Sequence, residues 1–331
     1  MKKNQILALL LAAVMLLALG VPAMAAGEIP VDAEHFPDQA LRTYVTDYCD
    51  TNKDNKLSAA ECEAVQCIDL FEMKITKVAD MTGIEHFTNL RELLVCGNQI
   101  TALDLSGMAK LEKLDVSGCS KLQSLKLAGC SALTQLDASS CALTTLDLTG
   151  CSALKTVACS YNALTALDVS GSEKLTTLEC SANHLTALDL SGHKMLKVLT
   201  CSLNSLTKLD LTGCTALESL DCSGNALTAL DLSYNGALEY LGVNDNPITE
   251  LNLHPLSNLQ ELSCYKMKLT KLDVSRCPKL RRLYCNDNQI ETLDLRSNKK
   301  LETLQCQNNR LSWLDLSSNT ALDPRYVCLL Y

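Results

Sequence analysis

The chain has 331 residues, with 29 Lys and Arg against 38 Asp and Glu, which gives a formal net charge of −9 at pH 7. An acidic chain without a basic stripe argues against a nucleic-acid partner and against binding to anionic membrane surfaces. The length would suit two ordinary domains, but an internal repeat over residues 90–321 favours one elongated body.

Residues 1–25 have the pattern of a secretory signal peptide. Lys2 and Lys3 precede an apolar run from Ile6 to Val21, and small residues follow it. We expect cleavage after Ala25 or Ala26 and a secreted, extracellular chain, whether or not it stays at the cell surface. A retained membrane anchor is the alternative, but the run is shorter than the ~20 residues that a spanning helix needs. We therefore expect no membrane insertion once the signal is removed.

Residues 26–64 differ from the repeats and are expected to form a helical N-terminal cap. Phe36, Leu41 and Val45 are apolar at helical spacing. The twelve residues that follow match a calcium-binding EF-hand loop almost position by position, since oxygen ligands recur where a hard cation requires them. The predicted Ca²⁺ ligands are Asp50, Asn52, Asp54, the carbonyl of Lys56 and the bidentate carboxylate of Glu61.

The loop departs from the EF-hand pattern at Asn55, where the pattern has Gly. Asn adopts the left-handed conformation more readily than other non-Gly residues, so the bend is expected to survive. A single loop of this kind favours one weak structural Ca²⁺ site that stiffens the cap. The alternative is an Asx-rich turn that covers the first repeat without a metal.

From Leu90 to Ala321 one sequence pattern recurs eleven times, with a period of 21 residues and once of 22. The pattern is L-x-x-L-x-C-x-x-N-x-L-T-x-L-D-L-S-x-x-x-x, and such a period is typical of a leucine-rich repeat, where each copy is one turn of a solenoid. The first half of each copy alternates apolar and polar residues, as a strand with one buried side does. The second half resembles the first and leaves no room for a helix. The sequence therefore predicts a β-rich leucine-rich repeat solenoid with a parallel concave sheet, a non-helical convex side and a small α-helical, EF-hand-like cap.

Irregular segments flank the repeats. Residues 65–89 are expected to form an irregular first turn. Residues 322–331 begin a twelfth turn and are expected to be a partial repeat or a short C-terminal cap.

Two inward-facing repeat positions form ladders of identical residues. The Asn at the ninth position is expected to satisfy backbone groups of adjacent turns with its amide. Cys119, Cys141 and Met267 interrupt this Asn ladder, so those turns should be locally irregular. The sixth position holds Cys where other copies have Val or Ala, which indicates a buried apolar role as a free thiol. Because neighbouring turns lie ~4.8 Å apart, disulfides are not excluded by distance. These cysteines are Cys159, Cys180, Cys201, Cys222, Cys264, Cys285 and Cys306.

The second half of the repeat carries a row of aspartates, which has two interpretations. In the first interpretation, the aspartates form weak calcium sites between turns. The other is a solvated face whose carboxylates bond nearby Ser, Thr or backbone N–H groups. The row is Asp104, Asp147, Asp168, Asp189, Asp210, Asp231, Asp273, Asp294 and Asp315.

The signal, the segment from Phe36 to Val45, the Asp50–Glu61 loop and the repeats together resemble secreted, internalin-like leucine-rich repeat proteins of Gram-positive bacteria. The resemblance covers almost all of the mature chain. It implies surface adhesion or contact with host proteins. It implies no contact residues, because these differ freely among such proteins.

The concave face changes character from Leu238 onward. The outward positions before it are mostly small or neutral, whereas Tyr and Arg follow. Tyr and Arg most often anchor protein interfaces, and rows of Tyr also stack against sugar rings. The predicted ligand-binding residues are Tyr240, Glu261, Tyr265, Arg282 and Tyr284.

These features predict a secreted or surface binding module, adhesin-like and monomeric, whose concave face recognises a protein or a glycan. A structural spacer, or a piece of a larger surface protein with no ligand of its own, is the alternative. Enzyme activity is not expected, because the five His are scattered and neither G-x-S-x-G nor H-E-x-x-H occurs.

Overall fold

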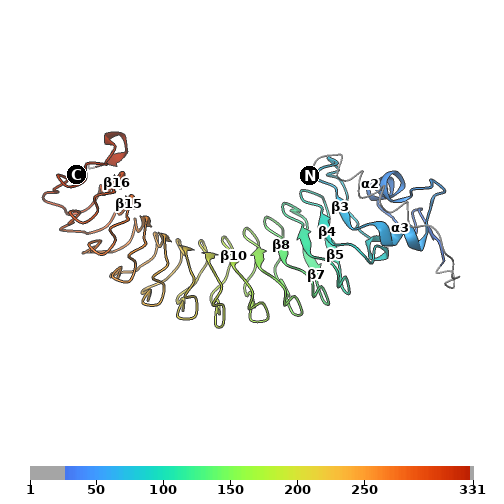
Figure 1. Ribbon diagram of the computed structural model, residues 1–331, viewed down its shortest axis with the longest axis horizontal. Helices are drawn as coiled ribbons and strands as arrows, with labels where there is room; N and C mark the ends of the chain where they lie inside the picture. The colour runs from blue at the N-terminus through green and yellow to red at the C-terminus, as the bar shows by residue number, and fades with distance from the viewer. Residues whose placement is uncertain (1–26, 329–331) are drawn as a thin grey trace.

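A computed structural model describes residues 27–328 as an arc, with the cap at its N-terminal end (Figure 1). The predicted signal peptide, residues 1–25, lies outside the described residues, as do the last three residues of the predicted twelfth turn. Within residues 27–328 no helix has both the length and the apolar character needed to cross a membrane.

The cap contains two short helices joined by the predicted loop. Helix α2 (Gln39–Tyr44) continues as the π-helical turn η2 (Val45–Cys49), and α3 (Ala59–Ala64) follows the loop. Asp38 starts α2 because its carboxylate accepts the N–H groups of Ala40 and Leu41 at 2.8 and 3.0 Å. The strands β1 (Ile29–Pro30) and β2 (Lys56–Leu57) pair antiparallel across the module.

The cap packs on the first turn through Phe36, which is fully buried. Gly83 lies beneath its ring with φ +102°, and a Cβ there would lie 2.4 Å from Phe36 Cδ1 and 2.6 Å from the His35 carbonyl oxygen. Only glycine fits this contact, both in space and in backbone conformation. The 3₁₀ turn η3 (Ile84–His86) follows directly.

The repeats form one parallel sheet of thirteen strands within the described chain, and it follows the concave side of the arc (Figure 1). Each solenoid turn contributes one strand, and the register places the same repeat positions side by side. The strands are β3 (Cys67–Asp69), β4 (Glu92–Leu94), β6 (Lys113–Asp115), β8 (Gln135–Asp137), β9 (Thr156–Ala158), β10 (Thr177–Glu179), β11 (Val198–Thr200), β12 (Ser219–Asp221), β13 (Tyr240–Gly242), β14 (Glu261–Ser263), β15 (Arg282–Tyr284), β16 (Thr303–Gln305) and β17 (Val327–Cys328).

The central residue of nearly every strand is a buried Leu, which is why the 21-residue period specifies this sheet. Leu178, Leu199 and Leu220 are examples, all with 0% exposure. Burying one such side chain stabilises the fold by about 1.5–3 kcal/mol, so the stacked turns share one continuous core. The sheet ends with the 3₁₀ turn η4 (Pro324–Tyr326) and β17.

The convex side is non-helical, as predicted. It holds the short pair β5 (Ala102–Asp104) and β7 (Ser124–Lys126), and otherwise turns. The aspartates of this half are capped locally: the Oδ1 atom of Asp168 accepts the N–H of Ser170 at 2.9 Å, and Asp189 does the same with Ser191 at 2.8 Å. Hydrogen bonds of this kind lower the pKa of Asp168 and Asp189. The contacts match the interpretation of a solvated, hydrogen-bonded row.

The Asn ladder satisfies backbone groups, as expected. Asn162 Nδ2 donates to the carbonyls of Ala138 and Cys159 at 2.8 and 3.0 Å, and its Oδ1 accepts the Leu143 N–H at 3.0 Å. The expected irregularity at the interrupted turns was wrong for the sheet, because β6, β8 and β14 keep their parallel register. The thiols of Cys119 and Cys141 donate to carbonyls of the preceding turn, as Asn does.

The sixth-position cysteines are buried side by side in the core, with exposures of 0–4%. Burial raises the pKa of the Cys180 thiol to about 12. Within residues 27–328 every cysteine is a free thiol.

Candidate functional site

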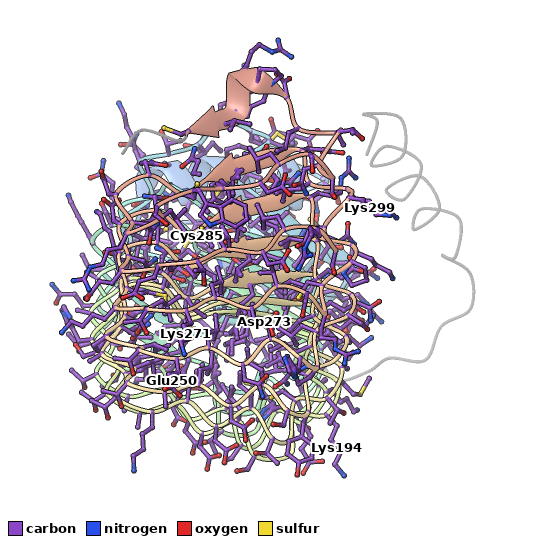
Figure 2. All side chains as sticks on the ribbon, turned by 90° about the vertical axis from the view of Figure 1, so that its left-hand side faces the viewer. Lys194, Glu250, Lys271, Asp273, Cys285 and Lys299 are labelled. Carbon is purple, nitrogen blue, oxygen red and sulfur yellow. The ribbon has the colours of Figure 1, made fainter. Side chains whose placement is uncertain are left out.

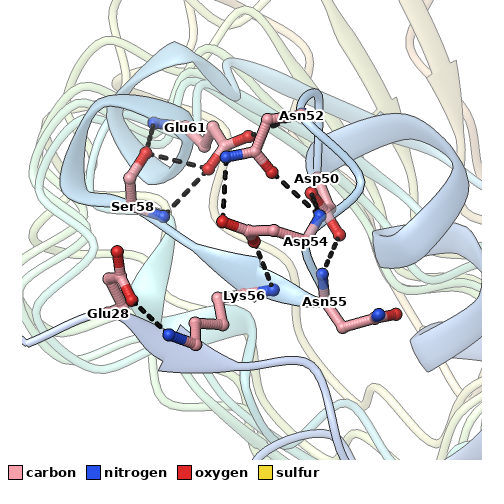
Figure 3. A network of polar contacts seen from close by, with 8 residues as sticks. All are labelled: Glu28, Asp50, Asn52, Asp54, Asn55, Lys56, Ser58 and Glu61. Atoms are coloured by element: carbon pink, nitrogen blue, oxygen red, sulfur yellow. Dashed lines mark hydrogen bonds and ion pairs between the residues drawn. The ribbon is translucent and has the colours of Figure 1, made fainter.

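The predicted calcium loop lies between η2 and α3, and its side chains turn inward onto one another (Figure 3). Asp50 is 1% exposed and accepts the N–H groups of Asp54 and Asn55 at 3.3 and 2.9 Å. Asn52 Oδ1 accepts the Asp54 N–H at 3.0 Å, and Asp54 Oδ1 accepts the Lys56 N–H at 2.9 Å. The structure thus brings together the predicted oxygen ligands of positions 1, 3 and 5.

Asn55 has φ 63°, which is the left-handed conformation expected at the sixth position of the loop. Lys53 also has a positive φ, of 60°, and its ammonium donates to the Asp47 carbonyl at 3.0 Å. The loop therefore has the bend that a calcium cage requires, with Asn in place of Gly.

Glu61 closes the loop from the start of α3. Its Oε1 accepts from the Thr51 N–H and hydroxyl at 2.8 and 2.7 Å, and its Oε2 accepts the Ser58 N–H at 2.9 Å. Ser58 and Glu61 form a capping box at the helix start. Burial raises the pKa of the Glu61 carboxyl, but the hydrogen bonds from Ser58 and Thr51 outweigh burial and bring it to about 2. The predicted twelfth-position ligand is therefore ionised and held in the loop.

Among residues 27–328, no group of three or more His, Cys, Asp or Glu side chains is arranged to hold a metal ion by itself. A cation in this loop would also need the amide oxygen of Asn52 and the carbonyl of Lys56. Both are neutral oxygen donors of the kind that Ca²⁺ accepts.

The five predicted contact residues of the concave face lie on three neighbouring strands and the bend after β14. The register pairs Tyr240 with Glu261 and Glu261 with Arg282. Tyr284 pairs with the small Ser263, and Tyr265 follows β14 at the edge of the same face. We call Tyr240, Glu261, Tyr265, Arg282 and Tyr284 the concave patch.

Charge and burial hold the concave patch in place. Arg282 Nε donates to Glu261 Oε2 at 2.5 Å, and the carboxylate raises the pKa of Arg282. Burial raises the pKa of Tyr284 as well, so its hydroxyl stays a donor at neutral pH. Lys266 Nζ lies 6.0 Å from the centroid of the Tyr265 ring, within cation–π range.

Tyr240 lies down on the sheet, because its neighbour two residues on is Gly242. A Cβ at Gly242 would lie 2.9 Å from the Tyr240 hydroxyl and 3.0 Å from Asp221 Oδ1. Burial and the charge of Asp221 raise the pKa of Tyr240 to about 12. The ring is thus a fixed floor of the patch rather than a free side chain.

The sequence analysis missed two residues beside the patch. Asn286 and Gln307 occupy the same repeat position as Tyr265, one and two turns later. Each has a buried side-chain oxygen without a hydrogen-bond partner in the described chain, Oδ1 of Asn286 and Oε1 of Gln307. Their shared repeat position was the signal that would have found them.

Comparison with known proteins identifies the fold. The family profile of the leucine-rich repeat domain of the endo-beta-N-acetylglucosaminidase EndoS matches residues 36–183, less than half of the chain. No curated protein matches the sequence. An internalin, inlF, from Listeria monocytogenes is 21% identical, with a TM-score of 0.70 over 91% of this chain and 98% of that one. The fold is a leucine-rich repeat solenoid of the internalin type.

Two further structures are informative. InlJ from Listeria monocytogenes, whose functional domain is described as including a cysteine ladder, is 29% identical, with a TM-score of 0.50 over 91% of this chain and 80% of that one. A chain of the Toll–Spatzle complex from Drosophila is 21% identical, with a TM-score of 0.62 over 76% of this chain and 39% of that one. Such solenoids are typically binding scaffolds rather than enzymes.

Proposed function

We propose that the chain is a secreted or surface-associated, adhesin-like binding module that recognises a protein ligand through the concave patch. The observation that carries the proposal is the cluster of three Tyr and one Arg on adjacent turns, held by the Glu261–Arg282 ion pair. Aromatic and Arg side chains dominate binding energy at interfaces, and a curved sheet offers a broad contact area.

Two observations support a protein ligand. The buried side-chain oxygens of Asn286 and Gln307 have no partner within residues 27–328 and lie in the row next to Tyr265, where a side-chain rotation would turn them towards a partner's backbone donors. The Toll chain with this fold is described in a complex with Spatzle. A glycan stacked on the tyrosines is the second ligand class, favoured by the flat Tyr240 ring above Gly242.

The proposal includes one structural Ca²⁺ in the cap loop, held by Asp50, Asn52, Asp54, the Lys56 carbonyl and Glu61. The left-handed bend at Asn55 and the ionised Glu61 support it. The ion would take the inward oxygens that now accept backbone N–H groups, so binding is weak, at about 10⁻⁴–10⁻³ M as in extracellular modules. Its role is to stiffen the cap against the first turn.

The test is binding of the chain from Gly27 onward to panels of extracellular proteins and of glycans, with and without calcium. The triple variant Tyr265→Ala, Arg282→Ala, Tyr284→Ala should lose at least about 100-fold in affinity for a bound ligand, since each anchor contributes about 2 kcal/mol or more. The double variant Thr177→Ala, Thr200→Ala changes two of the same repeat positions in the middle of the arc and should bind normally.

Each outcome separates the alternatives. An equal loss of affinity in the triple variant and the control would refute the concave patch as the binding site. Unchanged affinity in the triple variant would place the binding site elsewhere on the chain. Absence of any ligand would favour the structural spacer. N-terminal sequencing of exported protein tests secretion, and a start at Ala26 or Gly27 is expected.

A further inference from the structure

The positive charge of this acidic chain is concentrated in its last repeats. Between Leu259 and Cys328 there are twelve Lys and Arg against eight Asp and Glu, although the whole chain carries −9. Along the linear sequence these residues form no basic stripe. The solenoid changes this assessment, because it brings residues 21 positions apart onto one flank.

A hollow of about 400 Å³ lies on that flank, outside the concave patch. Its lining comes from three successive turns: Gln260, then Lys279 and Arg281, then Lys299, Lys300 and Glu302, with Ala321 at the end. We call it the basic hollow. Figure 2, which looks along the solenoid from its C-terminal end, places Lys299 on the flank. The volume falls within the range of about 300–1,000 Å³ that is usual for small-ligand sites.

Backbone hydrogen bonds fix the spacing of the lining. The Arg281 N–H donates to the Gln260 carbonyl and the Glu302 N–H donates to the Arg281 carbonyl, both at 2.8 Å. Lys279 and Lys300 each directly precede a fully buried Leu, so their backbones are anchored. The lysine side chains therefore project from a rigid frame.

The cationic side chains of the basic hollow differ in their ion-pair and hydrogen-bond partners. Arg281 is paired with Glu302, because its Nε and Nη2 atoms both donate to Glu302 Oε1, at 3.0 and 2.7 Å. Lys279 Nζ donates to Asn258 Oδ1 at 2.7 Å, which leaves its charge without a counterion. Lys299 and Lys300 form no ion pair within residues 27–328. Three uncompensated ammonium groups thus surround one hollow.

These groups indicate the chemistry of the ligand. Ammonium groups act as compact point charges and suit a tetrahedral oxyanion, whereas planar carboxylates are better matched by a free Arg fork. The Arg281 fork is already occupied. Gln260 and Glu302 also line the hollow. The Gln260 amide nitrogen donates to Glu239 Oε2 at 2.9 Å and Arg281 occupies Glu302 Oε1, which leaves Gln260 Oε1 and Glu302 Oε2 as acceptors suited to neutral hydroxyl groups. No aromatic side chain lines it, although stacking on aromatic rings is usual in single-stranded nucleic-acid sites.

We propose that the basic hollow binds a sulfate or phosphate monoester carried on a sugar, with Lys279, Lys299 and Lys300 holding the anion. The hydroxyls of the sugar ring pair with Gln260 and Glu302. This site lies on the flank and is separate from the concave patch, so it adds a second ligand to the proposed function.

The test is calorimetric titration at low ionic strength with a heparin-derived hexasaccharide, its desulfated form, mannose 6-phosphate, inorganic sulfate and a U₁₀ oligonucleotide. The variant Lys299→Glu, Lys300→Glu should lower the affinity for the sulfated or phosphorylated sugar at least tenfold. Its matched control is Lys174→Glu, Lys194→Glu, which changes the same two repeat positions in earlier turns and alters the net charge by the same amount. Lys194 lies on the same flank as Lys299 (Figure 2). The milder Lys299→Gln, Lys300→Gln variant serves if the reversal perturbs folding.

The site is supported if the Lys299 and Lys300 variants lose affinity for the charged sugar while the affinity of the control changes less than twofold. Stronger binding of the sulfated hexasaccharide would identify a sulfate ester as the ligand group, and stronger binding of mannose 6-phosphate would identify a phosphate ester. Equal loss in both variants would mean diffuse attraction and would overturn the proposal. Tighter binding of U₁₀ than of the charged sugars would overturn the proposal too. So would failure to bind either charged sugar, or binding of the charged sugars no tighter than the desulfated hexasaccharide or inorganic sulfate. Unchanged sugar binding in Tyr265→Ala, Tyr284→Ala separates this site from the concave patch.

Discussion

The Cys119 thiol donates to the carbonyl oxygen of Val95 in the preceding turn, at 3.4 Å. Val95 lies 24 residues earlier, the same offset that separates Asn162 from its acceptor Ala138. Cys119 thus replaces the donor half of an Asn that the ladder otherwise uses. The Val95 carbonyl also accepts from Asn98 Nδ2 at 2.9 Å, so the thiol supplies the second of its two hydrogen bonds, a contribution of about 0.5–1.5 kcal/mol.

A similar contact occurs at the bend on the other side of the repeat, where some turns also carry a cysteine, such as Cys130 and Cys277. Cys130 and Cys277 contact the carbonyls of Leu105 and Leu253 at 3.3 and 3.9 Å. At equivalent bends Asn235 donates to Leu211 at 3.2 Å, and His193 Nε2 lies 3.1 Å from the Val169 carbonyl oxygen. Cys, Asn and His thus all supply an inward donor at this bend, whereas Leu256 fills the equivalent position with an apolar side chain.

Asn183→Ala should destabilise the solenoid by about 1–3 kcal/mol, because it leaves the Leu164 N–H unsatisfied and removes one of the two amide donors to the Cys159 carbonyl. Asn183→Cys should cost about 1 kcal/mol less, since a thiol can still donate as Cys119 does. Urea unfolding followed by circular dichroism measures both. Equal destabilisation by Ala and Cys would refute the donor role of the thiol.

Cys180→Val should change the unfolding free energy by less than about 1.5 kcal/mol, because other turns carry Val at this position and the volume is similar. Cys180→Ser should cost about 1–3 kcal/mol, because it buries a hydroxyl among apolar side chains. The comparison uses thermal unfolding of the two variants. A Ser variant as stable as the Val variant would contradict an apolar role for this ladder.

Alkylation of the native protein by iodoacetamide at pH 8 should reach Cys67 well before the ladder cysteines. Cys67 is exposed, and burial raises its pKa only to about 11, against about 12 for Cys180. The thiolate is the reactive form, so labelling of Cys67 should speed up as the pH rises towards its pKa. Mass spectrometry after timed quenching reports each site. Early labelling of Cys180 in folded protein would show that the core opens locally.

Gly97→Ala should destabilise the protein by about 1 kcal/mol, although no atom lies within 4 Å of the new Cβ, because φ is +69°. Gly171→Ala is the matched control: it also has open space but no left-handed φ, and it should be neutral or stabilise by about 0.4–1 kcal/mol. Differential scanning calorimetry distinguishes them. Other copies of this bend hold Ala182 and Leu203 at φ 53°, so identical melting shifts would show that the left-handed conformation carries no cost here.

Glu61→Gln should destabilise the cap at neutral pH. The folded pKa of Glu61, about 2, lies below the ordinary value of 4.5, so its contribution of up to about 3 kcal/mol is complete above pH 4.5 and is lost as the pH falls towards 2. The variant should lack this pH dependence. Hydrogen exchange of α3 amides between pH 6 and 3 measures it.

The proposed calcium site predicts that about 10 mM CaCl₂ stabilises the wild-type cap by about 1.5–3 kcal/mol and does not change the stability of the cap in the Glu61→Gln variant. Exchange of the loop amides with and without the ion reports this. Equal stabilisation of both proteins would place the effect outside the loop.

The sequence predicted the fold because each turn repeats the same burial. A Leu such as Leu199 is buried by its counterparts in adjacent turns, so the period alone specifies the stacking. The left-handed bend at Asn55 was also predictable, since it follows from loop chemistry within twelve residues. The irregularity expected at Cys119 and Met267 was not found in the sheet, because the strand register is kept by backbone pairing and buried Leu residues whether or not the ninth position carries a donor.

By itself, then, the sequence determined the leucine-rich repeat solenoid and its inward ladders, since the same residues recur at the same positions of every period; the period also gave the positions from which the concave patch was predicted. Only the tertiary structure decided which residues meet across turns. It brought Asp221 and Tyr240 of successive turns together at Gly242 and gathered Lys279, Lys299 and Lys300 around one hollow. The physical reason is that stacking adds contacts between residues 20 or more positions apart, and these depend on side-chain direction and on the curvature of the arc rather than on local pattern.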